Sequence, residues 1–120
     1  MNIVAYKDND GNIPFVNWLY DASRRDQRIA EKIRSALEVL QEYGYRLRRP
    51  VADYLRDDIY ELRIHFGKVN YRVFYGFHGD KIVIFQGCVK EATVPSKEID
   101  RAVNMMETYK SDPERHIYGI

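Results

Sequence analysis

Residues 59–72, IYELRIHFGKVNYR, alternate apolar and polar side chains on either side of a single glycine. Successive side chains of a β-strand point to opposite faces of its sheet. One face of the first half is therefore apolar and carries Tyr60, Leu62 and Ile64. The other face is polar and carries Glu61, Arg63 and His65. This pattern predicts an antiparallel strand pair with its charged side chains gathered on one surface.

Three segments of this kind follow one another, and we expect strands over residues 59–65, 69–77 and 82–89. The turns between them, FGK and HGD, are short and contain glycine, which is typical of an antiparallel meander. The third segment contains the continuously apolar run IVIF. We therefore expect this strand to be central in the sheet, or covered on both of its faces.

The rest of the chain supplies helices and one more strand. Residues 2–6 are short and β-prone, and an apolar stripe at helical spacing begins at Pro14. A second stripe, which Ser23 can cap, ends at Gly44, and a third follows Pro95. The predicted fold class is therefore α+β. It combines a mostly antiparallel sheet of about four strands with two N-terminal helices and one C-terminal helix.

Composition and charge indicate how many domains the chain forms, which partners it can bind and in which compartment it works. We expect residues 1–120 to form one domain, with a connection over residues 46–58 and a loosely held tail over residues 111–120. The formal net charge is only +1, so any nucleic-acid-binding surface must be a local patch. The one cysteine, Cys88, allows no disulfide and suits a reducing compartment. With no signal-peptide pattern and no membrane-length apolar segment, we expect a cytoplasmic protein without a membrane partner.

Three basic residues are the candidate catalytic group, because the predicted strands bring them to one region: Arg63, Arg72 and Lys90. The planar guanidinium group of arginine matches phosphate oxygens and keeps its charge near neutral pH. Such a cluster is what a phosphate-handling site needs. The alternative is that both arginines are exposed strand residues paired with Glu61, and that Lys90 is an ordinary surface lysine.

Five further residues are candidates for RNA binding: Arg46, Arg48, Arg49, Tyr60 and His65. The short basic run can hold a phosphate backbone, and an exposed tyrosine can stack on bases. His65, near a turn, can act as an acid or a base. Each candidate has a plainer alternative. The basic run can be an ordinary solvated loop. The tyrosine can lie at the rim of the core, and the histidine can be an exposed turn residue.

Several familiar sites are missing from the sequence. It contains no GxxxxGK[ST] or GxGxxG nucleotide loop, no HExxH or paired CxxC zinc motif, and no GxSxG nucleophile motif. We therefore expect no metal and no cofactor.

The segments IYELR (59–63), YRVFY (71–75) and IVIF (82–85) are followed by Lys90 and then by Pro95, Glu98, Ile99 and Ala102. In this order and spacing the chain resembles a HigB-type toxin of the RelE/ParE superfamily, in its phage-derived branch. The resemblance covers roughly residues 47–109 and implies a RelE-like fold. One departure is Glu91, which stands where the family carries a second lysine.

The resemblance implies the toxin of a type II toxin-antitoxin system, a metal-independent endoribonuclease that cuts mRNA on the ribosome. Arg63 and Arg72 would hold the phosphate, and Lys90 would assist the leaving group or the electrostatics. A helix-turn-helix antitoxin of the HigA type would neutralise the toxin. Two alternatives stay open: a gyrase-directed toxin of the ParE type, and an inactive module that only binds a helix-turn-helix protein.

Overall fold

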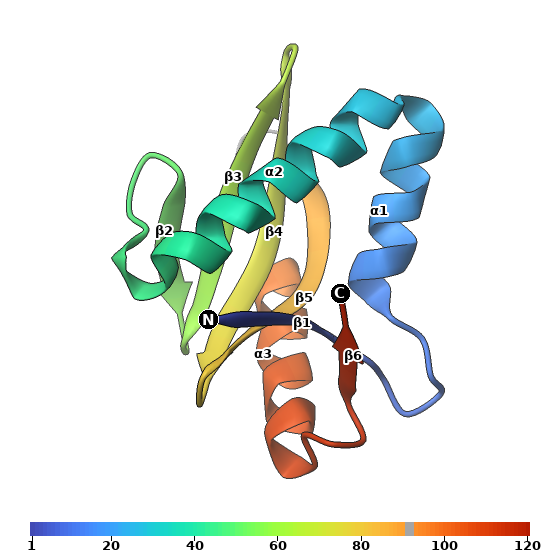
Figure 1. Cartoon of the computed structure of the whole chain (residues 1–120), viewed down its shortest axis with the longest axis vertical. Helices are drawn as coiled ribbons and strands as arrows, with labels where there is room; N and C mark the ends of the chain where they lie inside the picture. The colour runs from blue at the N-terminus through green and yellow to red at the C-terminus, as the bar shows by residue number, and fades with distance from the viewer. Residues whose placement is uncertain (91–92) are drawn as a thin grey trace.

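Figure 1 shows the computed structural model, which describes residues 1–90 and 93–120 and, at Lys90, the backbone alone. The elements in chain order are β1 (Asn2–Tyr6), α1 (Pro14–Arg25), α2 (Gln27–Tyr43), a short 3₁₀ turn η1 (Gly44–Arg46), β2 (Ala52–Arg56), β3 (Ile59–Phe66), β4 (Val69–His78), β5 (Lys81–Lys90), α3 (Ser96–Ser111) and β6 (Ile117–Gly119). The α+β class and the three long helices are confirmed.

The strands form one sheet in the order β2-β3-β4-β5-β1-β6. The predicted meander of β3, β4 and β5 is confirmed, and the pairing of β1 with β5 is the parallel one. The expectation of about four strands is wrong, because the described part of the chain has six. The two additional strands are β2, inside the expected connection, and β6, inside the expected tail.

Strand β2 was not predicted, because the turn that follows it has an unusual sequence. Asp57 and Asp58 form this turn with positive φ angles of 51° and 65°. Two residues with positive φ are the signature of a tight hairpin turn, which asparagine and glycine usually supply. The hairpin places Ala52 opposite Leu62 and Tyr54 opposite Tyr60. Two aspartates therefore form this hairpin turn, and no glycine or asparagine marks it in the sequence.

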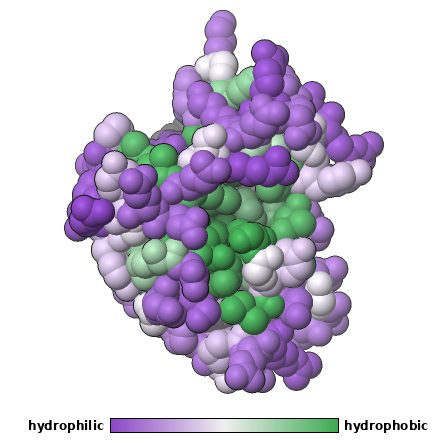
Figure 2. All heavy atoms as spheres, in the orientation of Figure 1, coloured by the Kyte–Doolittle hydropathy of each residue, from purple (hydrophilic) through white to green (hydrophobic). Residues whose placement is uncertain are grey.

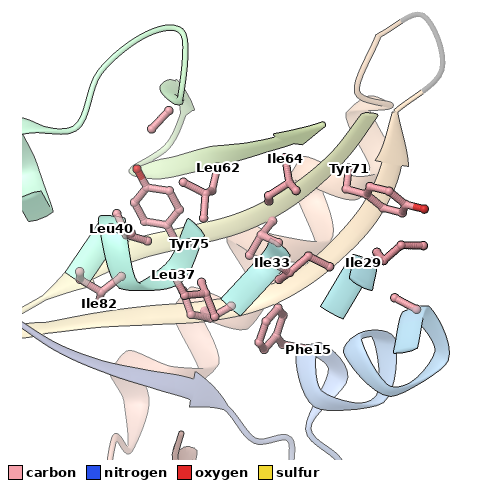
Figure 3. Close-up of a cluster of buried hydrophobic side chains, with 14 residues drawn as sticks. Phe15, Ile29, Ile33, Leu37, Leu40, Leu62, Ile64, Tyr71, Tyr75 and Ile82 are labelled. Atoms are coloured by element: carbon pink, nitrogen blue, oxygen red, sulfur yellow. The ribbon is translucent and has the colours of Figure 1, made fainter. Parts of the chain in front are cut away.

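Helices α1 and α2 cover one face of the sheet, as Figures 1 and 3 show. The apolar stripe of α2 packs on the predicted apolar face of β3 and on alternate residues of β4. Figure 3 labels the largest of these side chains, among them Phe15, Ile33, Leu37, Leu62 and Tyr75. This core holds the apolar side of the meander against the helices, which leaves its charged side facing away from them.

Helix α3 covers the opposite face. Its buried residues Ala102, Met106 and Tyr109 contact the second core, which includes Phe74 and Phe85. Residues 82–85 are fully buried between the two helical layers, so the prediction of a central, doubly covered strand is confirmed.

An irregularity in β5 decides which side chains reach the α3 face. Phe74 pairs with Gln86 but its neighbour Tyr75 pairs with Ile84, so the partner strand carries one extra residue there. Phe85 packs in the core under α3, and Gln86 bonds to Glu98 of α3. Because both neighbours turn toward α3, Cys88 beyond them also points to the α3 face, which carries the charged residues of β3.

The expected cap of the second helix is wrong. Ser23 lies inside α1, where its hydroxyl donates to the carbonyl of Tyr20 at 2.6 Å, and Asp26 caps α2 by accepting from the amide of Arg28 at 2.9 Å.

The C-terminal segment 111–120 is not loosely held. It ends in β6, which pairs with β1, and its His116 is 3% exposed. The apolar Ile117 and the buried imidazole anchor it.

Candidate functional site

The candidate catalytic arginines face each other directly. Arg63 of β3 pairs with Arg72 of β4, and Arg72 pairs in turn with Cys88 of β5. Directly opposed residues of antiparallel strands point to the same face, so these side chains form one row on the α3 side. In the next row, Asn70 lies opposite both His65 and Lys90. The strands therefore bring the backbone of Lys90 beside the arginine pair, while the Lys90 side chain and Glu91 lie outside the described residues.

Arg72 and its neighbour Glu61 are buried, which corrects the expectation of an exposed charged surface. Arg72 is 6% exposed and Glu61 is 3% exposed. The Nε atom of Arg72 lies 3.4 Å from Oε1 of Glu61, and Nη1 donates to the carbonyl of Tyr71 at 3.1 Å. A buried charge is tolerated only when an opposite charge or good hydrogen bonds compensate it. Glu61 and Arg72 therefore act as a structural pair as well as a part of the site.

Arg63 is the arginine that solvent reaches. Its side chain is 29% exposed. Nε donates to Glu61 Oε2 at 2.9 Å, and Nη2 lies 3.3 Å from Asp53 Oδ2. Glu61 thus bridges the two arginines through its two oxygen atoms. These contacts fix the direction of the Arg63 guanidinium group and leave its other N–H groups available to a ligand.

The network continues to the sheet edge. Asp53 of β2 also accepts from Arg49, whose Nε and Nη2 both lie 2.9 Å from Oδ2. Three guanidinium groups alternate with two carboxylates, which leaves the network one positive charge. The positive cluster expected from the sequence is therefore partly neutralised. Its remaining charge sits on rigidly held groups, which suits recognition of a single phosphate better than long-range attraction.

The N-terminal turn of α3 closes one side of the arginine row. Glu98 accepts from Nε2 of the buried Gln86 at 2.8 Å and lies 3.6 Å from Nη1 of Arg101. Burial raises the pKa of the half-buried Cys88 thiol to about 11; the carboxylate of Glu98 also raises it, Arg72 lowers it and Glu61 raises it. The thiol is therefore protonated near neutral pH and is not a nucleophile there. Neither Gln86 nor Glu98 was predicted as a site residue, because the bulge in β5 that brings them together leaves no sequence signal.

The candidate RNA-binding residues are split between two faces. His65 lies on the arginine face, exposed, with Nδ1 2.6 Å from Asn70 Oδ1. Tyr60 points to the opposite face, where its ring stacks on Tyr75 at 5.4 Å. It lines a cavity at the edge of the sheet together with Arg48 and Arg49. Arg46 stands apart, with its guanidinium group 5.4 Å from the ring centre of Tyr43.

Figure 2 shows an apolar hollow on the face that carries α1 and α2. A cavity of about 320 Å³ lies there between the two helices, β1 and the C-terminal residue. Its apolar lining residues are Ile3, Phe15, Val16, Leu19, Leu37 and Ile120. The predicted helical stripes include Phe15, Leu19 and Leu37, but helical periodicity does not show where two helices diverge, so the cavity itself was not predicted.

Within residues 1–90 and 93–120, no helix combines the length and the apolar character needed to cross a bilayer.

Comparison with known proteins places the chain in a family. No curated protein and no solved structure matches it at a significant level. The family described as "Phage derived protein Gp49-like (DUF891)" matches residues 18–107, which include all of β2 to β5 and most of the three long helices. The matched region contains Arg63, Arg72 and their carboxylate partners Asp53 and Glu61. The chain therefore belongs to the Gp49-like family of phage-derived proteins, a family of RelE- and HigB-like toxins.

Proposed function

We propose that this protein is the toxin of a type II toxin-antitoxin system and cleaves mRNA on the ribosome without a metal. The observation that carries the proposal is the direct pairing of Arg63 with Arg72 beside the backbone of Lys90, in a chain of a toxin family. Two guanidinium groups on one face provide fixed positive charge where a phosphodiester gains negative charge.

In the proposed reaction the RNA 2′-oxygen attacks the adjacent phosphorus, and the bond from phosphorus to the 5′-oxygen breaks. The proton lost by the 2′-hydroxyl is balanced by one gained at the leaving 5′-oxygen. Arg63 contacts the phosphate with the N–H groups that Glu61 and Asp53 leave available. Arg72 adds charge from below the surface and, through Glu61, keeps Arg63 oriented. Lys90 assists at the leaving oxygen, and His65 contacts the RNA.

Induction of the protein in bacterial cells tests this function. We expect growth arrest together with new 5′ ends inside translated mRNAs, mapped before and after induction. Arg24→Ala is the matched control for arginine loss, because Arg24 is exposed on α1, away from the arginine row. Arrest with intact mRNA and a DNA-damage response would contradict the proposal and favour a gyrase-directed toxin.

We also propose a helix-turn-helix antitoxin as the partner, because a free nuclease of this kind would damage its host. Two surfaces are candidates for the contact: the arginine row, and the exposed Arg24 and Arg25 at the end of α1. Arg28 is less available, because it is paired with Asp26 at 2.8 Å. Co-purification with the product of the neighbouring reading frame separates the two. Arg24→Glu with Arg25→Glu weakens the complex only if the antitoxin holds the helices, and Arg63→Ala only if it covers the site.

One observation favours a second candidate function, an inactive module that only binds its partner. Glu61 and Asp53 already neutralise most of the charge on the arginines. In that case the induced protein leaves growth and mRNA unchanged but still binds the neighbouring gene product.

A further inference from the structure

A cavity of about 470 Å³ opens at the β2 edge of the sheet. We call it the β2 cavity, and it is lined by Leu47, Arg48, Arg49, Ala52, Asp53, Tyr54 and Tyr60. Its size is in the range of small-ligand sites, which is about 300–1,000 Å³. The wall combines two exposed guanidinium groups with two phenol rings. Neither the rim of an apolar core nor a solvated loop needs this combination.

The aromatic wall is exposed but rigid. Tyr54 is 50% exposed, and its ring meets Tyr60 edge to face at 5.1 Å. Tyr60 in turn stacks on the buried Tyr75. The hydroxyl of Tyr54 accepts from the amide of Asp58 at 3.2 Å, so the far end of the ring is held as well. An aromatic ring that is fixed at both ends yet open on one face is suited to stack on another flat group.

The cationic wall is also held in place. Arg49 is directed by Asp53, and Nη1 of Arg48 donates to the carbonyl of Tyr45. Both arginines remain exposed at their outer edges. Guanidinium groups with free N–H edges bind phosphate oxygens in a defined geometry.

The β2 cavity adjoins the arginine row. Oδ2 of Asp53 lies 2.9 Å from Nε of Arg49 and 3.3 Å from Nη2 of Arg63, so one carboxylate oxygen touches both sites. Tyr54 and Tyr60 point to the opposite face of the sheet from Arg63, so a single strand that reaches both sites has to pass around the β2 edge, where Asp53 and Arg49 lie.

We propose that the β2 cavity binds one unpaired nucleotide of single-stranded RNA, with its base stacked on Tyr54 and its phosphate at Arg48 and Arg49. RNA as the ligand rests on the proposed function. The wall chemistry favours it over an acidic peptide, which would use the arginines but leave the exposed ring without a partner. Proteins that bind single strands combine stacked aromatic rings with positive charge in this way.

Fluorescence anisotropy with a labelled eight-nucleotide RNA, without ribosomes and at low salt, tests the proposal. We expect Tyr54→Ala to weaken binding by about tenfold, the usual effect of losing one stacked base. Tyr54→Phe keeps the ring and should restore most of the affinity. Arg48→Gln and Arg49→Gln should each weaken binding and lower the salt slope by about one. Tyr20→Ala is the matched control, because Tyr20 is an exposed tyrosine with Arg24 beside its ring at 5.9 Å, on α1.

Unchanged RNA affinity in Tyr54→Ala would overturn the proposal, as would polyglutamate binding that depends on Tyr54 when RNA does not bind. The titration does not depend on cleavage. If induction leaves mRNA intact but Tyr54→Ala still loses RNA affinity, the β2 cavity stands and the nuclease function fails. If mRNA is cleaved but Tyr54→Ala binds like the wild type, the reverse holds.

Discussion

Glu61 and Arg72 lie side by side in the sheet, with Oε1 of Glu61 3.4 Å from Nε of Arg72. Neither of these two atoms has a hydrogen-bond partner among the described residues, although their separation is within ion-pair range. The attraction between them is therefore mainly electrostatic. It acts where solvent screening is weak, so removing one partner exposes the full cost of burying the other.

Arg72→Ala should destabilise the fold, because it leaves the Glu61 carboxylate buried with Arg63 as its only partner. We expect the free energy of unfolding to fall by about 3–5 kcal/mol, the usual cost of breaking a buried ion pair. Urea denaturation followed by the fluorescence of Trp18, the one tryptophan, measures it. The double variant Glu61→Leu/Arg72→Leu should lose less stability than Arg72→Ala. Equal stability of Arg72→Ala and the wild type would show that the pair contributes nothing.

Arg63→Ala should separate activity from stability. Its pair with Asp53 is partly solvent-exposed, but its bond to Glu61 satisfies a buried carboxylate. We therefore expect a loss of about 1–3 kcal/mol in the free energy of unfolding, smaller than that of Arg72→Ala. Loss of one charge-stabilising group lowers a rate by roughly a hundredfold or more, so mRNA cleavage and growth arrest should largely disappear. Growth and mRNA 5′ ends are compared at equal expression, with Arg24→Ala alongside. A fully toxic Arg63→Ala protein would exclude this residue from the site.

The Cys88 thiol should resist alkylation in the folded protein. Its pKa is raised by burial from 9.0 to about 11. At pH 8 the folded thiolate population is then about a hundredfold smaller than in unfolded chains, and the reaction with iodoacetamide slows accordingly. Because the folded pKa is the higher one, the thiol stabilises the fold below pH 9 and loses that contribution as the pH rises toward 11.

Urea-unfolded protein is the control for the thiol measurement, since it should react at the rate of a free cysteine. Glu98→Gln should increase the folded rate, because it removes a negative charge that raises the thiol pKa. Equal rates in folded and unfolded protein would contradict the burial of this group.

His116→Ala should loosen the far edge of the sheet. The imidazole donates from Nδ1 to the carbonyl of Lys7 at 2.7 Å and stacks on Tyr6 at 5.8 Å. Loss of a buried hydrogen-bond partner costs about 1–3 kcal/mol. We expect faster amide hydrogen exchange in β1 and a lower melting temperature, with the exposed Arg115→Ala as the control. Unchanged exchange in β1 would mean that β6 does not depend on this anchor.

The parts of the fold that were predictable are those in which neighbouring segments pair. The alternation in residues 59–65 and 69–77 correctly predicted which side chains of β3 and β4 share a face. A tight turn joins the two strands and fixes their register, and side chains alternate between the faces with a period of two. The strands that escaped prediction are short edge strands. β2 depends on an unusual aspartate turn, and β6 on pairing with residues more than a hundred positions away.

The site was predictable to a lesser degree. Alternation places Arg63 and Arg72 on one face, but it does not say how much of that face a distant helix covers, so the burial of Arg72 could not be anticipated. The β2 cavity draws its walls from a loop and two strands. Neither periodicity nor spacing carries information about such a meeting of segments.

The position of β1 has a consequence for how the chain is made. β1 precedes both of its neighbours in the sheet, β5 and β6, by more than seventy residues of sequence. Its backbone groups therefore stay unpaired during translation until β5 has been made, since their partners do not yet exist. The half of the sheet near β1 closes only after the meander of β3, β4 and β5 has been synthesised, so this half of the fold forms late.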